Sequence, residues 1–253
     1  RGLTEPAWGT DQEFVTSELW ALREIAARPL SAEARDYVAG LRAAAQRGLT
    51  RMRTTDQGDS LLMTLPAGRW VDSLVAVVGT RDARARDLAL ALQASQRVYA
   101  LNTLNRGYES NFERADLQRR TFAAAYRAAE RRDRRPPRVL LKYGAYHMFR
   151  GLSPLGVQDL GDLVSNLATY NGTRSFHLLV LPGAGTKTGA LNLKTATADP
   201  TPIDVTDEPW ARPFYAAADP GAWCLFDLAA IRREKGWRPR LDPAAERVMF
   251  GYD

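Results

Sequence analysis

The chain has 253 residues, of which 45% are hydrophobic and 25% charged, the length and composition of an ordinary globular protein with a sizeable core. It carries 35 Lys and Arg against 29 Asp and Glu, a net charge of +6 that attracts anions in general. Nucleic-acid binding would require these charges to gather on one face, but the densest basic cluster, 127–138, also contains Glu130, Asp133 and two prolines. We therefore interpret that cluster as a solvated helix end and expect no nucleic-acid partner.

The single cysteine, Cys224, excludes an internal disulfide and any cysteine-rich zinc site. No apolar run of about 18 residues is present, so we expect no membrane-spanning helix, and no charged-then-apolar leader is found. The first residue is Arg1 rather than Met, which indicates a processed, tag-cleaved or partial chain. The sequence does not determine the compartment. If a leader was removed, we expect a periplasmic or secreted protein. The oligomeric state is left open as well.

Helices are expected through most of the first half of the chain. Thr10 and Glu13 have the spacing of a capping box, which predicts a helix that begins there and ends at Pro29. Apolar residues at helical spacing predict further helices over 31–53, 82–105 and 110–132. Residues 71–78 fit a helix or a strand, and we favour a helix. We treat residues 30–132 as a helical insertion into a single domain that covers 1–253.

The second half has the pattern of alternating strands and helices. Residues 139–141 form an apolar run after two prolines, which predicts a strand buried on both faces of a parallel sheet. An amphipathic helix over 157–167 and a second apolar run over 175–181 would complete a βαβ unit. Residues 182–202 are rich in Gly, Thr and Ala and predict a long loop or irregular hairpin. The remaining predicted elements are a strand over 223–226, a short helix over 227–235 and a strand over 248–250. The predicted fold is α/β, with a mainly parallel sheet, several long helices and a helix-rich N-terminal half.

Three polar side chains, Lys142, His147 and Arg150, follow the first predicted strand. Ligands of open α/β sheets bind at the carboxyl ends of strands, so this position favours a functional site. An imidazole acts as base, acid or ligand near neutral pH, although a loop histidine bonded to a backbone carbonyl is an equally good interpretation. Lys142 and Arg150 suit a carboxylate or phosphate, but they are equally able to pair with Glu5, Asp11 or Asp116. His177 lies inside an apolar run, where a satisfied core histidine is the better interpretation.

The Gly-rich stretch 183–189 does not have the spacing of a nucleotide-binding loop. A phosphate loop needs Gly directly before Lys, whereas Thr186 precedes Lys187 here. The dinucleotide fingerprint needs its third Gly three positions after the second, whereas Gly189 comes four after Gly185. We therefore expect a surface loop. No metal-ligand spacing occurs either, so the sequence predicts no cofactor and no metal.

Two stretches together resemble the erythromycin esterase-like proteins, whose wider relatives include haem-uptake and Tiki-type domains. The first, Thr4–Phe14, is similar to the family's strand-to-helix motif. The matching residues are Glu5, Gly9, Thr10, Glu13 and Phe14. Trp8 stands where the family has a histidine, and an indole cannot act as a general base.

The second stretch, Val139–Arg150, is similar to the later family strand that ends in a His-x-x-His pair. His147 fits the second histidine, and Gly144 stands in place of the first. The preceding helix resembles the family's Arg-bearing helix, with Arg119 or Arg120 as the nearest match. Asp227–Arg232 looks like a late helical segment of the same fold.

The resemblance implies a hydrolase that cleaves an ester or lactone by activating water. His147 or Glu5 would be the base, while Arg119, Arg120 or Arg150 would steady negative charge. Trp8 and Lys142 would then line the substrate site together with Arg150. This reading requires Glu5 and His147 to face one cavity that holds a small-molecule substrate. Some wider relatives use a metal, which the ligand spacing here does not support.

Three alternatives to an active hydrolase of the family type stay open. The missing family histidines are compatible with a diverged or inactive enzyme, or with a non-catalytic domain that binds a small anionic ligand in a basic cleft. In a purely structural interpretation, Lys142, His147 and Arg150 belong to an ordinary loop. A binding domain would need only the basic side chains to converge.

Overall fold

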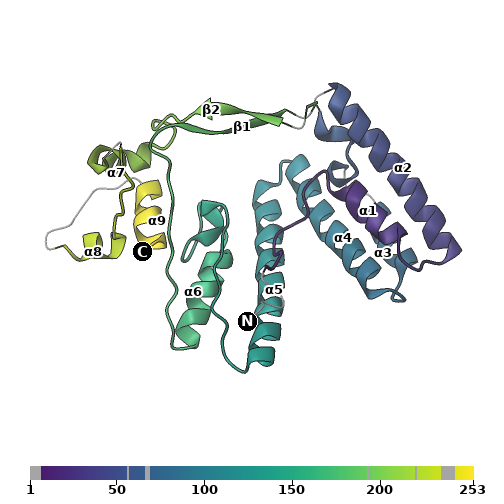
Figure 1. Ribbon diagram of the computed structural model, residues 1–253, viewed down its shortest axis with the longest axis horizontal. Helices are drawn as coiled ribbons and strands as arrows, with labels where there is room; N and C mark the ends of the chain where they lie inside the picture. The colour runs from purple at the N-terminus through teal and green to yellow at the C-terminus, as the bar shows by residue number, and fades with distance from the viewer. Residues whose placement is uncertain are drawn as a thin grey trace. The chain divides into compact units, whose positions relative to one another are not determined.

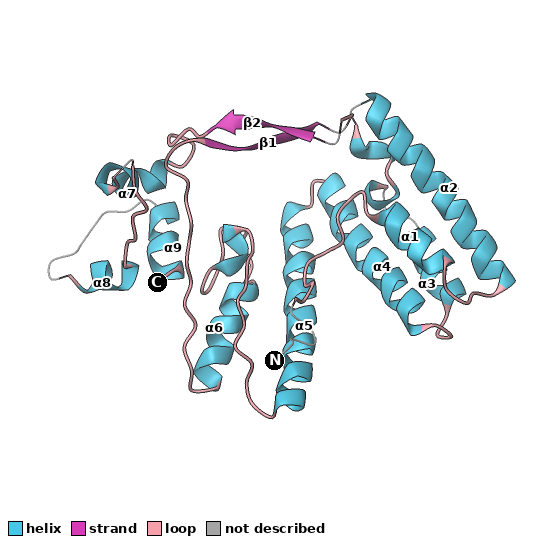
Figure 2. Ribbon diagram, in the orientation of Figure 1, coloured by secondary structure: helices cyan, strands magenta, loops and turns pink. Residues whose placement is uncertain are grey.

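The computed structural model describes residues 7–55, 57–65, 69–192, 194–195, 197–219, 221–234 and 243–253. Helices predominate, and the one sheet in these ranges is an antiparallel pair of strands (Figures 1 and 2). The predicted α/β fold with a mainly parallel sheet is therefore wrong. The chain divides into two compact units, one of Arg1–Thr121 with Leu191–Thr197 and the other of Phe122–Ala190 with Ala198–Asp253.

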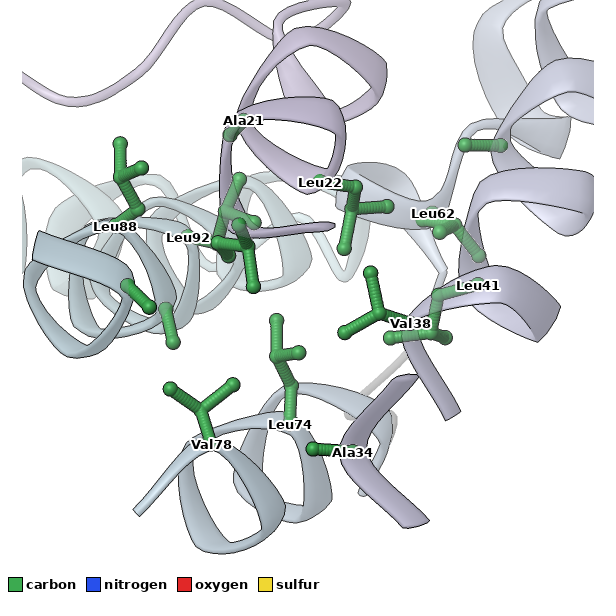
Figure 3. Packing of buried hydrophobic residues seen from close by; sticks show 14 of the residues in the cluster. Ala21, Leu22, Ala34, Val38, Leu41, Leu62, Leu74, Val78, Leu88 and Leu92 are labelled. Atoms are coloured by element: carbon green, nitrogen blue, oxygen red, sulfur yellow. The ribbon is translucent and has the colours of Figure 1, made fainter. Parts of the chain in front are cut away.

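The first unit is a helical assembly. Its elements are α1 (Glu18–Ala26), α2 (Ala32–Thr55), η1 (Gly58–Ser60), η2 (Leu62–Thr64), α3 (Trp70–Val78), α4 (Ala83–Thr103) and the first part of α5 (Gly107–Asp133). Helix α1 packs against α2 and α4, and α3 packs against the same two helices. Leu22, Val38, Leu74 and Leu92 meet in the core between them (Figure 3). Each helix buries residues at the three- and four-residue spacing of an amphipathic helix, as the sequence predicts.

Polar side chains mark two of the predicted helix starts. The Ala34 amide donates a hydrogen bond to Ser31 Oγ at 3.1 Å before α2, and the Ala85 amide donates to Asp82 Oδ1 at 2.8 Å before α4. The predicted helices over 31–53 and 82–105 are thereby confirmed. The capping box at Thr10 is wrong, because α1 begins only at Glu18. The Glu13 amide instead donates to Ser95 Oγ on α4, at 2.8 Å.

A carboxylate is buried in the first unit. Glu18, in the first turn of α1, is only 1% exposed, and its two oxygens accept hydrogen bonds from the Leu62 and Met63 amides at 3.1 and 2.8 Å. Burial raises the pKa of Glu18 from 4.5 to about 7, and the two amide hydrogen bonds oppose that rise. The side chain therefore joins α1 to the N-terminus of η2 at an electrostatic cost that depends on pH.

The second unit is built from shorter elements. After the last part of α5 come η3 (Ala145–Met148), α6 (Leu160–Tyr170), β1 (Thr186–Asn192), β2 (Thr197–Pro202), η4 (Pro209–Ala211), α7 (Arg212–Ala217), α8 (Leu228–Arg233) and α9 (Pro243–Gly251). The two strands belong to this unit except at their 191–197 end, which falls in the first. Its core gathers around Phe149, which contacts the Tyr252 ring edge-on with centroids 5.0 Å apart. Strands β1 and β2 confirm the hairpin alternative for residues 182–202.

The predicted parallel strands are the main error. Residues 139–141, 175–181 and 223–226 pair with no strand of the described chain, and Leu140 is 96% exposed. An apolar run predicts burial, but a strand also needs a neighbour for its amides and carbonyls. Here two of the runs bury individual side chains against the Phe149 core instead, namely Leu179 and Phe226.

Residues 248–250, predicted as a strand, lie in helix α9. A short apolar run fits a strand or a helix equally well, and the flanking residues decide between them. Pro243 at the first helical position and the alanines after it favour a helix.

Candidate functional site

A buried histidine–carboxylate pair lies in the second unit. His147 Nδ1 is 2.6 Å from Asp159 Oδ2, with His147 8% exposed and Asp159 fully buried. The other carboxylate oxygen of Asp159 accepts the Leu160 amide at 2.7 Å, at the N-terminus of α6, where the helix dipole favours negative charge. Asp159 is therefore held by its helix, and it holds the imidazole in turn.

Close packing of η3 on α6 brings the two side chains together. A Cβ added at Gly161 would lie 2.3 Å from the Met148 carbonyl carbon, so only glycine permits this approach. On its other side η3 is tied to the Phe149 core, since the Tyr252 hydroxyl donates a hydrogen bond to the Ala145 carbonyl. The fold thus fixes the backbone on both sides of His147.

The pair has the geometry of a base and the group that orients it. A carboxylate only accepts hydrogen bonds, so Asp159 favours the tautomer with the proton on Nδ1. The Nε2 atom of His147 then carries a lone pair, and no hydrogen bond within the described residues occupies it. An imidazole in this state is able to take a proton from water.

His177 has a different environment. It is 3% exposed, its Nδ1 lies 2.8 Å from the Met148 carbonyl, and its Nε2 lies 3.0 Å from Ser175 Oγ. Burial lowers the pKa of His177, while the hydrogen bond to the Met148 carbonyl opposes that effect. The prediction of a satisfied core histidine is confirmed.

The two basic residues near His147 in the sequence, Arg150 and Lys142, have different surroundings. Arg150 forms an ion pair with Asp253 and donates a second hydrogen bond to the Ser175 carbonyl at 3.0 Å. Its charge is thus already compensated, which weakens the case for a basic anion-binding cleft. Lys142 is exposed on the extended stretch before η3.

The other predicted site residues lie elsewhere in the chain. Arg119 and Arg120 belong to the first unit and both reach Asp116 on the same helix, at 3.8 and 2.8 Å. Trp8 also belongs to the first unit and is half-buried. Glu5 falls outside the described residues, so its predicted approach to His147 stays a prediction.

The first unit has a surface hollow of about 510 Å³. It is lined by Arg97, Leu101, Arg106, Tyr108, Glu109, Phe112 and Glu113. Its arginines pair with its glutamates, Arg97 with Glu113 at 3.2 Å and Arg106 with Glu109 at 3.0 Å. These compensated charges offer little to a charged ligand, so we place the candidate site at His147 and Asp159.

Two classes of feature are absent from the part of the chain that the structure describes. No group of three or more His, Cys, Asp or Glu side chains there has the arrangement of a metal site. None of its helices is both long enough and apolar enough to cross a membrane.

Searches of family models, curated proteins and solved structures returned no match to this chain. The candidate site therefore stands on the chemistry of its own residues.

Asp159 is the site residue that the sequence did not single out. An Asp directly before an amphipathic helix is a helix-start signal, and it would have moved the predicted start from 157 to 160. That signal accounts for the bond to the Leu160 amide. Its pairing with His147 depends on the path of the loop between them, which has no sequence signature.

Proposed function

We propose that this chain is a hydrolase that cleaves an ester or lactone with a water molecule activated by His147. The observation that carries the proposal is the 2.6 Å contact between His147 Nδ1 and the fully buried Asp159. A histidine that is oriented in this way has its second nitrogen available as a general base. The resemblance of Val139–Arg150 to the erythromycin esterase-like proteins supports the same class of reaction.

The reaction would proceed in two proton-transfer steps. His147 Nε2 removes a proton from water as the oxygen attacks the carbonyl carbon, which gives a tetrahedral oxyanion. The carbon–oxygen bond to the leaving group then breaks, and the imidazolium returns its proton to the departing alkoxide. The products are a carboxylic acid and an alcohol, or a hydroxy acid from a lactone. Asp159 stabilises the imidazolium between the two steps.

The test is acid release from a panel of short aliphatic esters, aryl esters, small lactones and macrolactones, followed by automatic titration. Wild-type protein is expected to release acid from at least one member. The His147→Gln variant, purified in the same way, is expected to fall to the background rate while keeping the wild-type circular dichroism spectrum. Equal rates for the two proteins would show that any hydrolysis comes from a contaminant or another site, and no acid release from any member would reject the proposal.

A further inference from the structure

The segment 175–181 has one face in the core and one face in solvent. Side-chain exposure alternates along it, with His177 buried and Leu179 packed against the Phe149 core, while Phe176, Leu178 and Val180 are 72%, 56% and 59% exposed. This alternation is that of a β-strand, in which successive side chains point to opposite faces. In Figure 1 the chain runs as an extended stretch from the end of α6 toward β1. The segment therefore has the side-chain alternation of a strand, but it pairs with no strand of the described chain.

One edge of this segment is already occupied. The His177 amide donates to Asp253 Oδ2 at 2.6 Å, and the His177 carbonyl accepts the Asp253 amide at 3.1 Å. In an extended chain the amide and carbonyl of one residue point to the same side, and those of the next residue point to the other. The backbone groups of Phe176, Leu178 and Val180 thus form the opposite edge, and they have no hydrogen bond to any described residue.

The charge pattern identifies a second copy as a suitable partner. No charged residue occurs between Arg174 and Lys187. Antiparallel pairing of two copies about Leu178 would place Phe176 opposite Val180, an aromatic and β-branched pair that stabilises sheets. Pro182 has no amide proton, so it would end the ladder directly after this apolar segment.

The other long extended stretch lacks this self-complementarity. Pairing residues 138–142 with a second copy about Leu140 would place Arg138 opposite Lys142, and like charges in that position are destabilising. Leu140 is nevertheless the more exposed of the two central leucines, at 96%. Exposure alone would favour the stretch around Leu140, whereas charge favours the segment around Leu178.

We propose that two copies of the chain associate through antiparallel pairing of their 176–180 edges, with Leu178 on the two-fold axis. A contact of this size lies at the weak end of protein interfaces, so the dimer is reversible and depends on concentration. Each copy carries a net charge of +6, so added salt strengthens the association by screening the repulsion between copies.

The test is sedimentation equilibrium over a concentration series, with Leu178→Lys as the disrupting variant and Leu140→Lys as the matched control. Wild-type protein is expected to dimerise. Leu178→Lys is expected to weaken the dimer by at least about tenfold, because it places two lysines opposite each other and removes apolar contact. Leu140→Lys is expected to leave the dimer unchanged. A wild-type monomer at every concentration, a dimer unaffected by Leu178→Lys, or equal loss in both variants would overturn the proposal.

Cross-linking gives a second readout that does not depend on introducing a charge at position 178. In a Cys224→Ser background, Leu178→Cys is expected to form a cross-linked dimer with a short bismaleimide, and Leu140→Cys is not. Cross-linking at position 140 but not at 178 would overturn the proposed register. A monomer whose edge binds an unrelated extended apolar peptide would assign the edge to another partner and would also overturn it.

Discussion

The Asp159→Asn variant is expected to lower kcat by about two to four orders of magnitude for the best ester or lactone substrate, with a smaller change in KM. An asparagine amide is able to donate a hydrogen bond to Nδ1, which would move the ring proton to Nε2 and remove the lone pair that attacks water. The change affects orientation and proton position rather than substrate contact, so it acts on kcat. Steady-state kinetics measure both constants.

Asp162→Asn is the matched control for this experiment. Asp162 lies in the first turn of the same helix and accepts the Gly151 amide at 3.1 Å, a bond that an asparagine oxygen preserves. It should retain wild-type kcat. If Asp159→Asn also retained wild-type kcat, Asp159 would have no role in positioning the base.

Glu18 is expected to make the stability of the fold depend on pH. Its pKa is raised from 4.5 to about 7, so the folded chain holds this proton more tightly than the unfolded chain. The contribution to the unfolding free energy is fully present below pH 4.5 and is lost as pH rises through about 7. The change is on the order of 3 kcal/mol, because each unit of pKa shift corresponds to about 1.4 kcal/mol.

Urea unfolding of the wild type and of Glu18→Gln across this pH range, followed by circular dichroism, measures the effect. A glutamine does not titrate, so the wild type should lose stability relative to the variant as pH rises through the window. The difference between the two proteins cancels contributions from other groups, such as Asp11. Burial acts to raise the pKa of Asp11, but its hydrogen bonds to Arg114 and Gln118 outweigh that effect and lower it. Glu24→Gln changes an exposed position of the same helix, so its unfolding free energy should vary with pH as that of the wild type does. A difference between wild type and Glu18→Gln that is constant over the range would show that Glu18 does not titrate as described.

The helices were the part of the fold that the sequence could predict. A helix satisfies its backbone within one segment, so apolar spacing together with a cap such as Asp82 specifies it locally. The buried Leu22, Val38 and Leu92 follow from the same spacing. The predicted parallel sheet was wrong, because the pairing of such strands depends on residues far along the chain, whereas the β1–β2 hairpin joins segments that are close in sequence. The run at 175–181 has the composition of a strand but no paired neighbour in the described chain.

The candidate site was likewise predictable from the sequence only in part. The functional interpretation of His147 came from its position after an apolar run, and that run turned out not to be a sheet strand. What makes His147 a candidate base is its contact with Asp159, which depends on the close approach of two segments at Gly161. The burial of Glu18 was not predictable either, because a glutamate in a first helical turn is ordinarily exposed and favoured there by the helix dipole. Both features arise from tertiary packing.

In the proposed mechanism, Asp159 holds the proton of His147 on Nδ1 and leaves Nε2 free as a base. Heteronuclear NMR of the ring nitrogens in mildly alkaline solution tests it directly. The chain has only two histidines, and His147→Gln assigns the two sets of signals. His147 is expected to be protonated at Nδ1 and bare at Nε2. A His147 ring that is bare at Nδ1 and protonated at Nε2 would contradict it.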